Sequence, residues 1–237
     1  MDFYIVTLFP EALESYISSS IIGRAQKSGR IRIHVINPRD FTDDTHKTAD
    51  PSRPAPASPN RGERTEVDDR PFGGGPGMVI RAEPVLRAVE SVLAKLGSLA
   101  SKSRIIIFSP SGKQFVQAMA RTWAKRHPAL ILICGRYEGV DERVRKILKA
   151  EEVSIGPYVL TGGELPALAI LDVTARHIPG VLGKTESLEE HHGSYPVYTR
   201  PEVLEWKHKK HAVPKILLSG DHAKIAAWRK RNTKNSP

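Results

Sequence analysis

The stretch at residues 130–183 constrains the fold of this chain more than any other part of it. Three turns that contain glycine follow short apolar runs there, at residues 135–139, 156–157 and 161–163. Parallel α/β sheets end their strands in such turns, and the bare amides and carbonyls of the turns then face a ligand. Because glycine allows close approach to the backbone, the pattern predicts a backbone-lined pocket that reads an adenine edge and a ribose.

The same stretch does not predict a phosphate-binding loop. It contains no G-x-x-x-x-G-K-[ST] motif, and no G-x-G-x-x-G motif lies on a turn between a strand and a helix. The other interpretation of the glycines is structural, because the tight turns of a compact sheet use the same residues. The pattern alone leaves both interpretations open.

Hydrophobic periodicity predicts strands that alternate with helices. The predicted strands cover residues 3–8, 31–35, 104–108, 130–134 and 153–155, with a turn at 109–112. The first predicted helix starts at Pro10 and places Leu13, Ile17, Ile21 and Ala25 on one face. The other predicted helices cover residues 82–96, 114–125 and 164–178. This alternation predicts an α/β fold with a mainly parallel sheet.

Charge and cysteine content narrow the class of protein. The chain has 237 residues and a formal net charge of +10, which makes nucleic acid the leading candidate partner. Cys134 is the only cysteine, so an intrachain disulfide is excluded and a reducing compartment is expected. No run approaches the roughly 18 apolar residues of a membrane span, and the N-terminus lacks the basic start of a signal peptide. We therefore expect a cytoplasmic protein without a membrane partner.

The end of the sequence is strongly basic. Residues 201–237 contain nine Lys and Arg and three acids, so +6 of the net charge of +10 lies there. This asymmetry is typical of phosphate contact, although a solvated charged face has the same composition. Aromatic residues make up only 6% of the chain, so composition does not indicate base stacking. A proline-rich segment at residues 51–66 lacks periodicity and is predicted to be disordered.

Several long motifs occur in the order found in one family. CGRYEGVDERV, SIGPYVLTGGELPA and YTRPEVLE, with NPRDF, HKT and VDDRPFGGGPGM upstream of them, closely resemble bacterial tRNA (guanine-N1)-methyltransferases, which methylate guanosine 37 beside the anticodon. The resemblance extends from the N-terminus to about residue 229. It implies the trefoil-knotted α/β core of the SPOUT methyltransferases, S-adenosylmethionine as methyl donor, tRNA as partner, and a homodimer.

The resemblance also implies a division into domains. A knotted, donor-binding domain at residues 1–183 is followed by a linker at 184–200 and by a small, helical, basic domain at 201–237 that binds tRNA. The related enzymes pass almost directly from HKT to VDDRPF, so residues 51–66 resemble an insertion in a surface loop. The glycine-rich loop at residues 71–78 is expected to help position the target base.

Individual residues receive roles from the same resemblance. Arg176, in the helix before Ile178-Pro179-Gly180, corresponds to the arginine that stabilises charge on guanine O6. The residues expected to hold the donor are Ser109, Pro110, Gly135, Tyr137, Glu138, Gly139, Ile155, Gly156, Pro157, Tyr158, Val159, Leu160, Gly162 and Gly163.

The sequence departs from the family at the general base. Relatives have an aspartate in the linker, but no aspartate lies between Asp172 and Asp221 here. His191 and Glu190 are the two candidates to remove the N1 proton, since a histidine is a base near neutral pH. Pro157 replaces another family aspartate and lacks an amide hydrogen. Mg²⁺ is a candidate further cofactor, for which the sequence assigns no ligands.

Two other functions stay open on the sequence alone. A chain that has lost the base is expected to be a catalytically impaired RNA-binding protein that retains the donor pocket. A SPOUT methyltransferase that acts on ribosomal RNA is the second alternative. Methyl transfer from labelled donor, followed by identification of the modified nucleotide, separates all three.

Overall fold

The computed structural model describes residues 1–42, 67–182 and 195–233. The chain divides into two compact units, Met1–Leu182 and Gly183–Pro237, each of which is described by itself. The predicted insertion at residues 51–66 and the candidate bases Glu190 and His191 lie outside the described residues.

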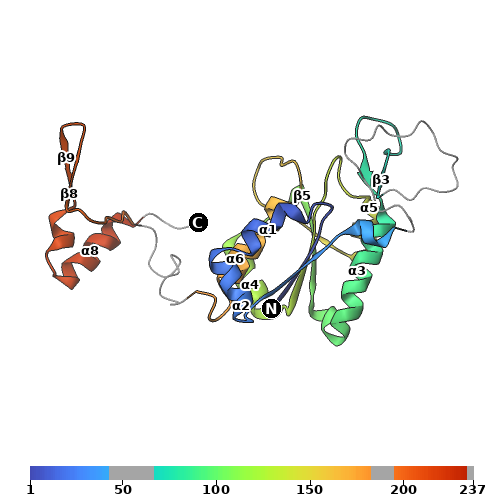
Figure 1. Ribbon diagram of the computed structural model, residues 1–237, viewed down its shortest axis with the longest axis horizontal. Helices are drawn as coiled ribbons and strands as arrows, with labels where there is room; N and C mark the ends of the chain where they lie inside the picture. Colours follow the sequence, from blue (N-terminus) through green and yellow to red (C-terminus); the bar gives the residue numbers. More distant parts are fainter. Residues whose placement is uncertain (43–66, 183–194, 234–237) are drawn as a thin grey trace. The chain divides into compact units, whose positions relative to one another are not determined.

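In the described part of the first unit, a five-stranded parallel sheet forms the centre (Figure 1). Its strands lie in the order β2-β1-β6-β5-β7. They are β1 (Asp2–Val6), β2 (Arg32–Ile36), β5 (Arg104–Gln114), β6 (Ala129–Ile133) and β7 (Glu151–Ser154). Each neighbouring pair is parallel, which confirms the predicted α/β fold with a mainly parallel sheet.

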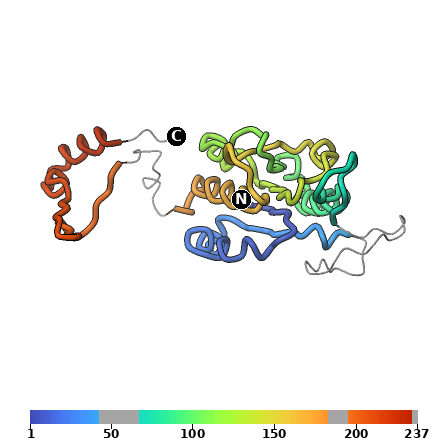
Figure 2. The backbone as a smooth tube through the Cα atoms, turned by 90° about the horizontal axis from the view of Figure 1, so that it is seen from above, coloured from blue at the N-terminus to red at the C-terminus, as the bar shows by residue number. Residues whose placement is uncertain are grey.

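Helices cover both faces of this sheet. One layer contains α1 (Glu11–Ile17), α2 (Ser20–Lys27), α4 (Gln117–Arg126) and α6 (Glu164–Ala175), and the other contains α3 (Ala82–Leu96), α5 (Glu142–Leu148) and the 3-10 helix η1 (Pro38–Phe41). Alternate residues of a strand point to opposite faces. Phe3 and Ile5 of β1 therefore pack with the first layer, and Tyr4 and Val6 with the second. Figure 2 shows α6 (orange) beside α1 (blue) in the first layer.

The single helix predicted from Pro10 onward is two helices in the structure, because the helix is interrupted between Ile17 and Ser20. Ser18 and Ser19 donate their hydroxyls to backbone carbonyls of the preceding turn, and such bonds compete with helix continuation. Ser20 then takes a positive φ of 47°. The apolar spacing was right for both helices, and the serines between them were the signal for the break.

Strand β5 also differs from its prediction, which ended it at Phe108 and placed a turn at residues 109–112. The strand continues to Gln114, but Phe108 and Lys113 both pair with Val153, so residues 109–112 form an excursion from the ladder. Pro110 lies inside the excursion, where the amide hydrogen that proline lacks is not needed for pairing. A polar segment thus leaves the sheet edge without ending the strand.

Two short strands on the side of α3 and α5 close the glycine-rich loop. They are β3 (Asp68–Asp69) and β4 (Val79–Ile80), which pair antiparallel. A 3-10 helix, η2 (Gly97–Lys102), follows α3. Residues 70–78 thus form a loop that starts and ends at one point of the first unit.

The second unit contains helix α8 (His222–Asn232) and a hairpin that the sequence analysis did not predict. The hairpin strands are β8 (Val203–Trp206) and β9 (Lys209–Ala212), and the 3-10 helix η4 (Lys215–Leu218) follows them. Lys207 and His208 form the turn with positive φ values of 48° and 61°. Sequence reasoning missed it because such two-residue turns usually carry Asn or Gly.

Among the described residues, no helix is both long enough and apolar enough to cross a membrane.

Candidate functional site

The predicted donor-binding residues lie on segments that leave three neighbouring strands. The excursion at residues 109–112 follows the first part of β5, the loop at 134–141 follows β6, and the loop at 155–163 follows β7. Because β6, β5 and β7 are adjacent and parallel, these segments meet at one edge of the sheet. Ligands of open α/β sheets bind outside the carboxyl ends of the strands, which is where these loops lie.

The loops after β6 and β7 are joined through their backbones. Gly163 donates its amide to the carbonyl of Gly135 at 2.9 Å, and Arg136 forms a β-bridge with Gly162. A Cβ atom on Gly163 would lie only 2.5 Å from Cα of Cys134. Gly162 and Gly163 are therefore required for the loops to approach each other, which is the structural interpretation that the sequence left open for them.

A largely buried polar network stabilises the contact between the loops after β6 and β7. Thr7, which follows β1, donates its hydroxyl to Oε1 of Glu164 at 2.6 Å, and both side chains are buried. Nε of Arg136 lies 3.0 Å from Oε2 of the same carboxylate, an ion pair that is too poorly aligned to count as a hydrogen bond. The guanidinium of Arg136 also lies 4.6 Å above the ring of Phe9. The start of α6, the loop after β6 and the end of β1 are thus fixed to one another.

The glycine-rich loop meets the loop after β6 on its other side. Glu138 donates its amide to the carbonyl of Met78 at 3.0 Å, and a Cβ atom on Gly77 would collide with the Glu138 side chain. Tyr137, which has a positive φ of 58°, hydrogen-bonds the carboxylate of Asp68. Burial raises the pKa of Asp68 above its usual 3.8, against the effects of Arg39 and Tyr137. The structure therefore brings residues 77–78 to the predicted donor loop.

The loop after β7 is shaped by its own side chains. The Ser154 hydroxyl donates to the carbonyl of Gly156 at 2.9 Å, and the Tyr158 hydroxyl donates to the carbonyl of Ile155 at 3.2 Å. Beyond this turn, Tyr158 and Val159 expose 53% and 81% of their surface. On the neighbouring segment the hydroxyls of Ser109 and Ser111 lie 2.9 Å apart. Apolar side chains and serine hydroxyls, rather than charged groups, thus surround the loop after β7.

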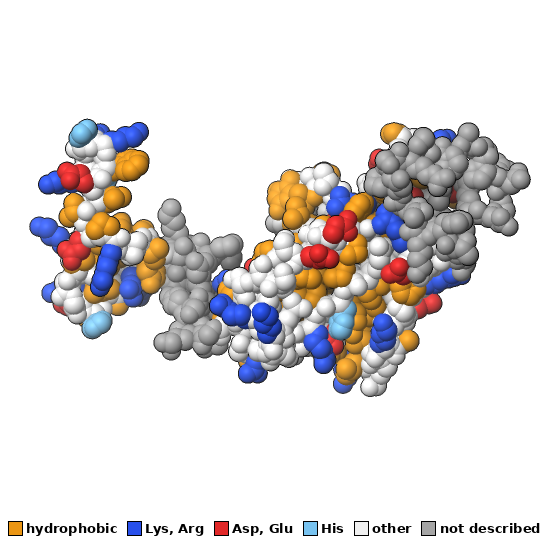
Figure 3. All heavy atoms as spheres, in the orientation of Figure 1, with side chains coloured by type: hydrophobic (Ala, Val, Ile, Leu, Met, Phe, Trp, Pro, Cys, Tyr) orange, Lys and Arg blue, Asp and Glu red, His pale blue; other side chains and the backbone are white. Residues whose placement is uncertain are grey.

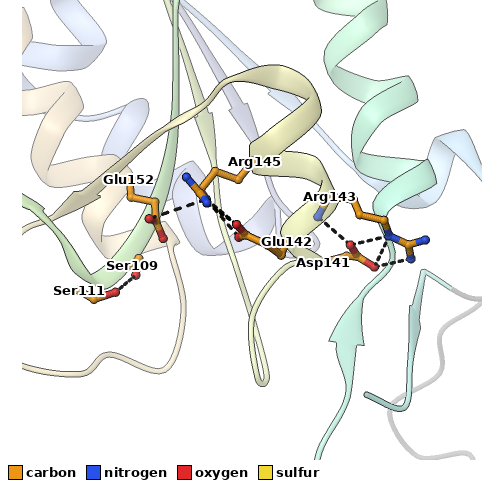
Figure 4. Close-up of polar contacts among 7 residues, drawn as sticks. All are labelled: Ser109, Ser111, Asp141, Glu142, Arg143, Arg145 and Glu152. Carbon is orange, nitrogen blue, oxygen red and sulfur yellow. Dashed lines mark hydrogen bonds and ion pairs between the residues drawn. The ribbon is translucent and has the colours of Figure 1, made fainter. Parts of the chain in front are cut away.

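The motif that follows Gly139 begins helix α5 and anchors it. Asp141 accepts a hydrogen bond from the amide of Arg143 at 2.9 Å, which caps the helix, and also pairs with the Arg143 guanidinium (Figure 4). The hydrogen bonds from Arg143 hold the pKa of Asp141 below its usual 3.8. Arg145 pairs with Glu142 and lies 3.8 Å from Glu152 of β7. The cap therefore fixes the helix that ends the donor loop.

These surroundings fit S-adenosylmethionine. A Cβ atom on Gly135 would have its nearest neighbour, a methyl group of Val140, at 3.6 Å, an ordinary contact, so packing does not require this glycine. Exposed aromatic and aliphatic side chains beside backbone groups suit an adenine ring and a ribose, which carry no charge. No group of three or more potential metal-ligating side chains occurs in the described ranges, so no ligands for Mg²⁺ are assigned.

The structure does not bring every predicted site residue together within one chain. Gly163 precedes the first residue of α6, and Arg176 caps its far end. With twelve residues in the helix, the two ends lie about 18 Å apart at 1.5 Å per residue. Cys134 is buried, and burial raises the pKa of its thiol well above the usual 9.0, so it has no role as a nucleophile.

Three residues of the site were missed by sequence reasoning. Thr7, Asp68 and Glu164 each lie against a predicted donor residue or its neighbour. A signal was present for two of them, because Thr7 ends an apolar strand and Glu164 begins an apolar helix. A buried polar group needs a partner, and these two residues supply it to each other.

Comparisons with known proteins point to one family. The family model described as tRNA (Guanine-1)-methyltransferase TrmD matches residues 1–54 and 59–236. A protein of Thermomicrobium roseum named tRNA (guanine-N(1)-)-methyltransferase is 48% identical over 234 residues, which cover 97% of this chain and 78% of the relative. Proteins of the same name from Moorella thermoacetica (44% identical, 96% of this chain and 83% of the relative) and Pasteurella multocida (43%, 97% and 85%) are similarly close.

Proposed function

Since this chain belongs to the tRNA (guanine-1)-methyltransferase family, we propose that it transfers a methyl group from S-adenosylmethionine to N1 of guanosine 37 in tRNA. The observation that carries the proposal is the convergence of the family motifs on one edge of the sheet. The excursion within β5 and the loops after β6 and β7 meet there, and the loop at residues 70–78 joins them through the bond from Glu138 to Met78. The trefoil knot of related enzymes is part of the same proposal.

The donor supplies a methyl group on a sulfonium, and the protein's task is to hold it in line with the nucleophile. Backbone groups of Gly135 and of residues 155–160 bind the adenosine, and the exposed Tyr158 and Val159 cover its ring. Gly162 and Gly163 act indirectly, because they allow the loop after β7 to pack on the loop after β6. Gly77 and Met78 lie next to Glu138, and the loop at residues 71–78 helps to position the target base.

The guanine must lose its N1 proton as the methyl group arrives. Arg176 stabilises the negative charge that grows on O6. His191 or Glu190 accepts the proton in place of the linker aspartate of relatives. Neither candidate base belongs to the described residues, so kinetic experiments must decide between them.

A homodimer is part of the same proposal, and the position of Arg176 and the surface of α6 support it. The helix is apolar on nearly all sides, yet Leu165 exposes 61% of its surface. A helix that is apolar all round is normally buried, and a second copy of the chain would cover it. The second copy would also bring an Arg176 to a donor loop that the same chain's arginine does not reach. Light scattering should give twice the mass of 26.2 kDa.

The basic residues at 201–237 bind tRNA phosphates, and the substrate implies a cytoplasmic location. The function is tested with labelled donor and an unmodified tRNA transcript that has guanine at position 37, against the same transcript with adenine there. We expect 1-methylguanosine, identified by nuclease digestion and mass spectrometry, in the first transcript alone. Binding of tRNA without methylation would favour a catalytically impaired RNA-binding protein. Transfer of the label to ribosomal RNA would favour a methyltransferase that acts on ribosomal RNA.

A further inference from the structure

The second unit contains a groove of about 550 Å³ that no part of the proposed chemistry uses. Three aromatic side chains, Tyr195, Tyr198 and Trp228, lie along it. The rings of Tyr198 and Trp228 have centroids 6.4 Å apart and are inclined by 59°. The guanidinium of Arg229 lies 5.1 Å above the ring of Tyr195. The groove therefore combines these ring faces with aliphatic side chains, which are Val197, Val213, Leu217, Leu218 and Ile225.

Tyr198 exposes half of its surface to a ligand, whereas Tyr195 and Trp228 are partly buried along the groove. No side chain among residues 195–233 is fully buried. Figure 3 shows hydrophobic side chains of this unit at the surface, among those of Lys and Arg. A groove lined by apolar and aromatic side chains with a few polar groups is typical of a binding site.

The charge around the groove selects the kind of occupant. Arg200 and Arg229 line it, and Glu202 is its one acidic lining residue within the described part of the unit. Residues 195–233 contain nine Lys and Arg but only three acidic residues, so the net positive charge of the unit attracts an anion. An occupant with flat aromatic rings and negative charge is a nucleotide, because bases stack on aromatic side chains while arginines contact phosphates.

We propose that this groove binds an unstacked nucleobase of the tRNA substrate, with the base on the rings of Tyr198 and Trp228 and its phosphate at Arg200 and Arg229. The site is separate from the one that receives the methylated guanine, and its assignment rests on the proposed function for the identity of the RNA. It also changes the expectation from composition. Aromatic residues are scarce in the whole chain, but the structure gathers three of them in one groove of the basic unit.

The test compares an RNA that offers unpaired bases with one that offers only phosphates. The first is the anticodon stem–loop of an unmodified tRNA, and the second is a fully paired RNA duplex of equal length. The full-length protein is titrated with each RNA at several salt concentrations. The variants are Trp228→Leu and Tyr198→Leu, which remove a ring, and Trp228→Phe and Tyr198→Phe, which retain one. Trp206→Leu is the matched control, because Trp206 exposes 63% of its surface on the hairpin of the same unit, outside the groove.

Removal of either ring should weaken stem–loop binding by about 5- to 150-fold, the range found when a stacking partner is deleted. Duplex binding and the salt dependence of both affinities should stay as in the wild type, because phosphate contacts are retained. The phenylalanine variants should recover most of the loss. If Trp228→Leu unfolds the unit, the Tyr198 pair decides, since half of the Tyr198 surface is exposed.

Unchanged stem–loop affinity, or an equal loss for stem–loop and duplex, would overturn the groove as a base site. A selective loss in Trp206→Leu alone would move the site to the hairpin and overturn it too. Methylation measured in parallel separates this proposal from the proposed function. A protein that methylates guanosine 37 but binds RNA independently of these rings contradicts the groove alone. Ring-dependent binding without methylation of any tRNA contradicts the proposed function alone.

Discussion

The hydroxyl of Thr7 donates a 2.6 Å hydrogen bond to the carboxylate of Glu164, across 157 residues of sequence. The ion pair between Arg136 and Glu164 makes the same carboxylate the common partner of the loop after β6 and the end of β1. Glycine turns set the shape of the donor loops, and this carboxylate sets their position.

Replacing Glu164 should therefore affect stability and donor binding together. Glu164→Gln retains an acceptor for Thr7 but leaves Arg136 without its counter-charge in a largely buried place. We expect a loss of about 1–3 kcal/mol in the free energy of unfolding, and weaker donor binding by calorimetry. Arg32→Gln is the matched control, because its pair with Asp2 is 70% exposed on the arginine side and worth about 0–1 kcal/mol. Equal losses in the two variants would contradict the network's role.

Gly135 and Gly163 should respond differently to a side chain. Gly135→Val places its Cβ at ordinary contact distance from Val140 rather than in a collision, so unfolding should change less than in a Gly163 variant, while donor affinity falls strongly. Gly163→Ala places a Cβ against Cα of Cys134 at 2.5 Å and should destabilise the first unit itself. Thermal unfolding and donor calorimetry on both variants make the distinction. Full donor affinity in Gly135→Val would remove that glycine from the pocket.

The cap of α5 predicts a pH-dependent stability difference. Asp141→Ala should cost about 1 kcal/mol at neutral pH, the usual value of an N-cap. Because the pKa of Asp141 is lowered in the folded state, its ionic contribution is present above the usual 3.8 and is lost as the pH falls through the folded value. The gap to wild type should shrink in denaturant titrations below about pH 4. Asp141→Asn retains a capping acceptor without charge, so its gap should be smaller at neutral pH.

His191 predicts a pH profile for methyl transfer. If His191 is the base, the single-turnover rate should fall as the pH drops through the histidine pKa, about 6.5 when unperturbed. His191→Ala should cost about 10²- to 10⁴-fold, and His191→Asp should restore activity. Glu190→Gln is the comparison on the same tRNA. Wild-type rates in His191→Ala, with collapse in Glu190→Gln, would identify Glu190 as the base instead.

Most of the fold could be predicted because its signals are local. Continuous apolar runs mark strands that are buried on both faces, as Leu130 to Ile133 are, and α3 has the predicted bounds. The break before Ser20 and the excursion at residues 109–112 were harder. Each depends on competition between side-chain and backbone hydrogen bonds, or on pairing with a distant strand, and neither changes the hydrophobic pattern.

The sequence predicted the loops of the candidate site, but it did not predict the tertiary contacts that hold these loops in place. The glycines mark turns, but only the structure distinguishes Gly135, where a Cβ atom would make an ordinary contact, from Gly163, where it would collide with Cys134. The pairing of Thr7 with Glu164 is a tertiary contact that no local spacing encodes. The groove in the second unit was missed for the same reason, since Tyr198 and Trp228 meet only after the chain turns back.

The strand order has a consequence for synthesis of the chain. β1 is the first strand to be made, and it lies between β2 and β6, which ends at Ile133. A nascent chain that has not yet exposed β6 can pair β1 on one side only, and its other edge presents unpaired backbone groups. The hydrogen bond from Thr7 to Glu164 forms later still, because Glu164 is synthesised after β6. The ribosome therefore releases an apolar strand long before the chain can shield it, and chaperones that hold unpaired strands should bind this protein most tightly in that interval.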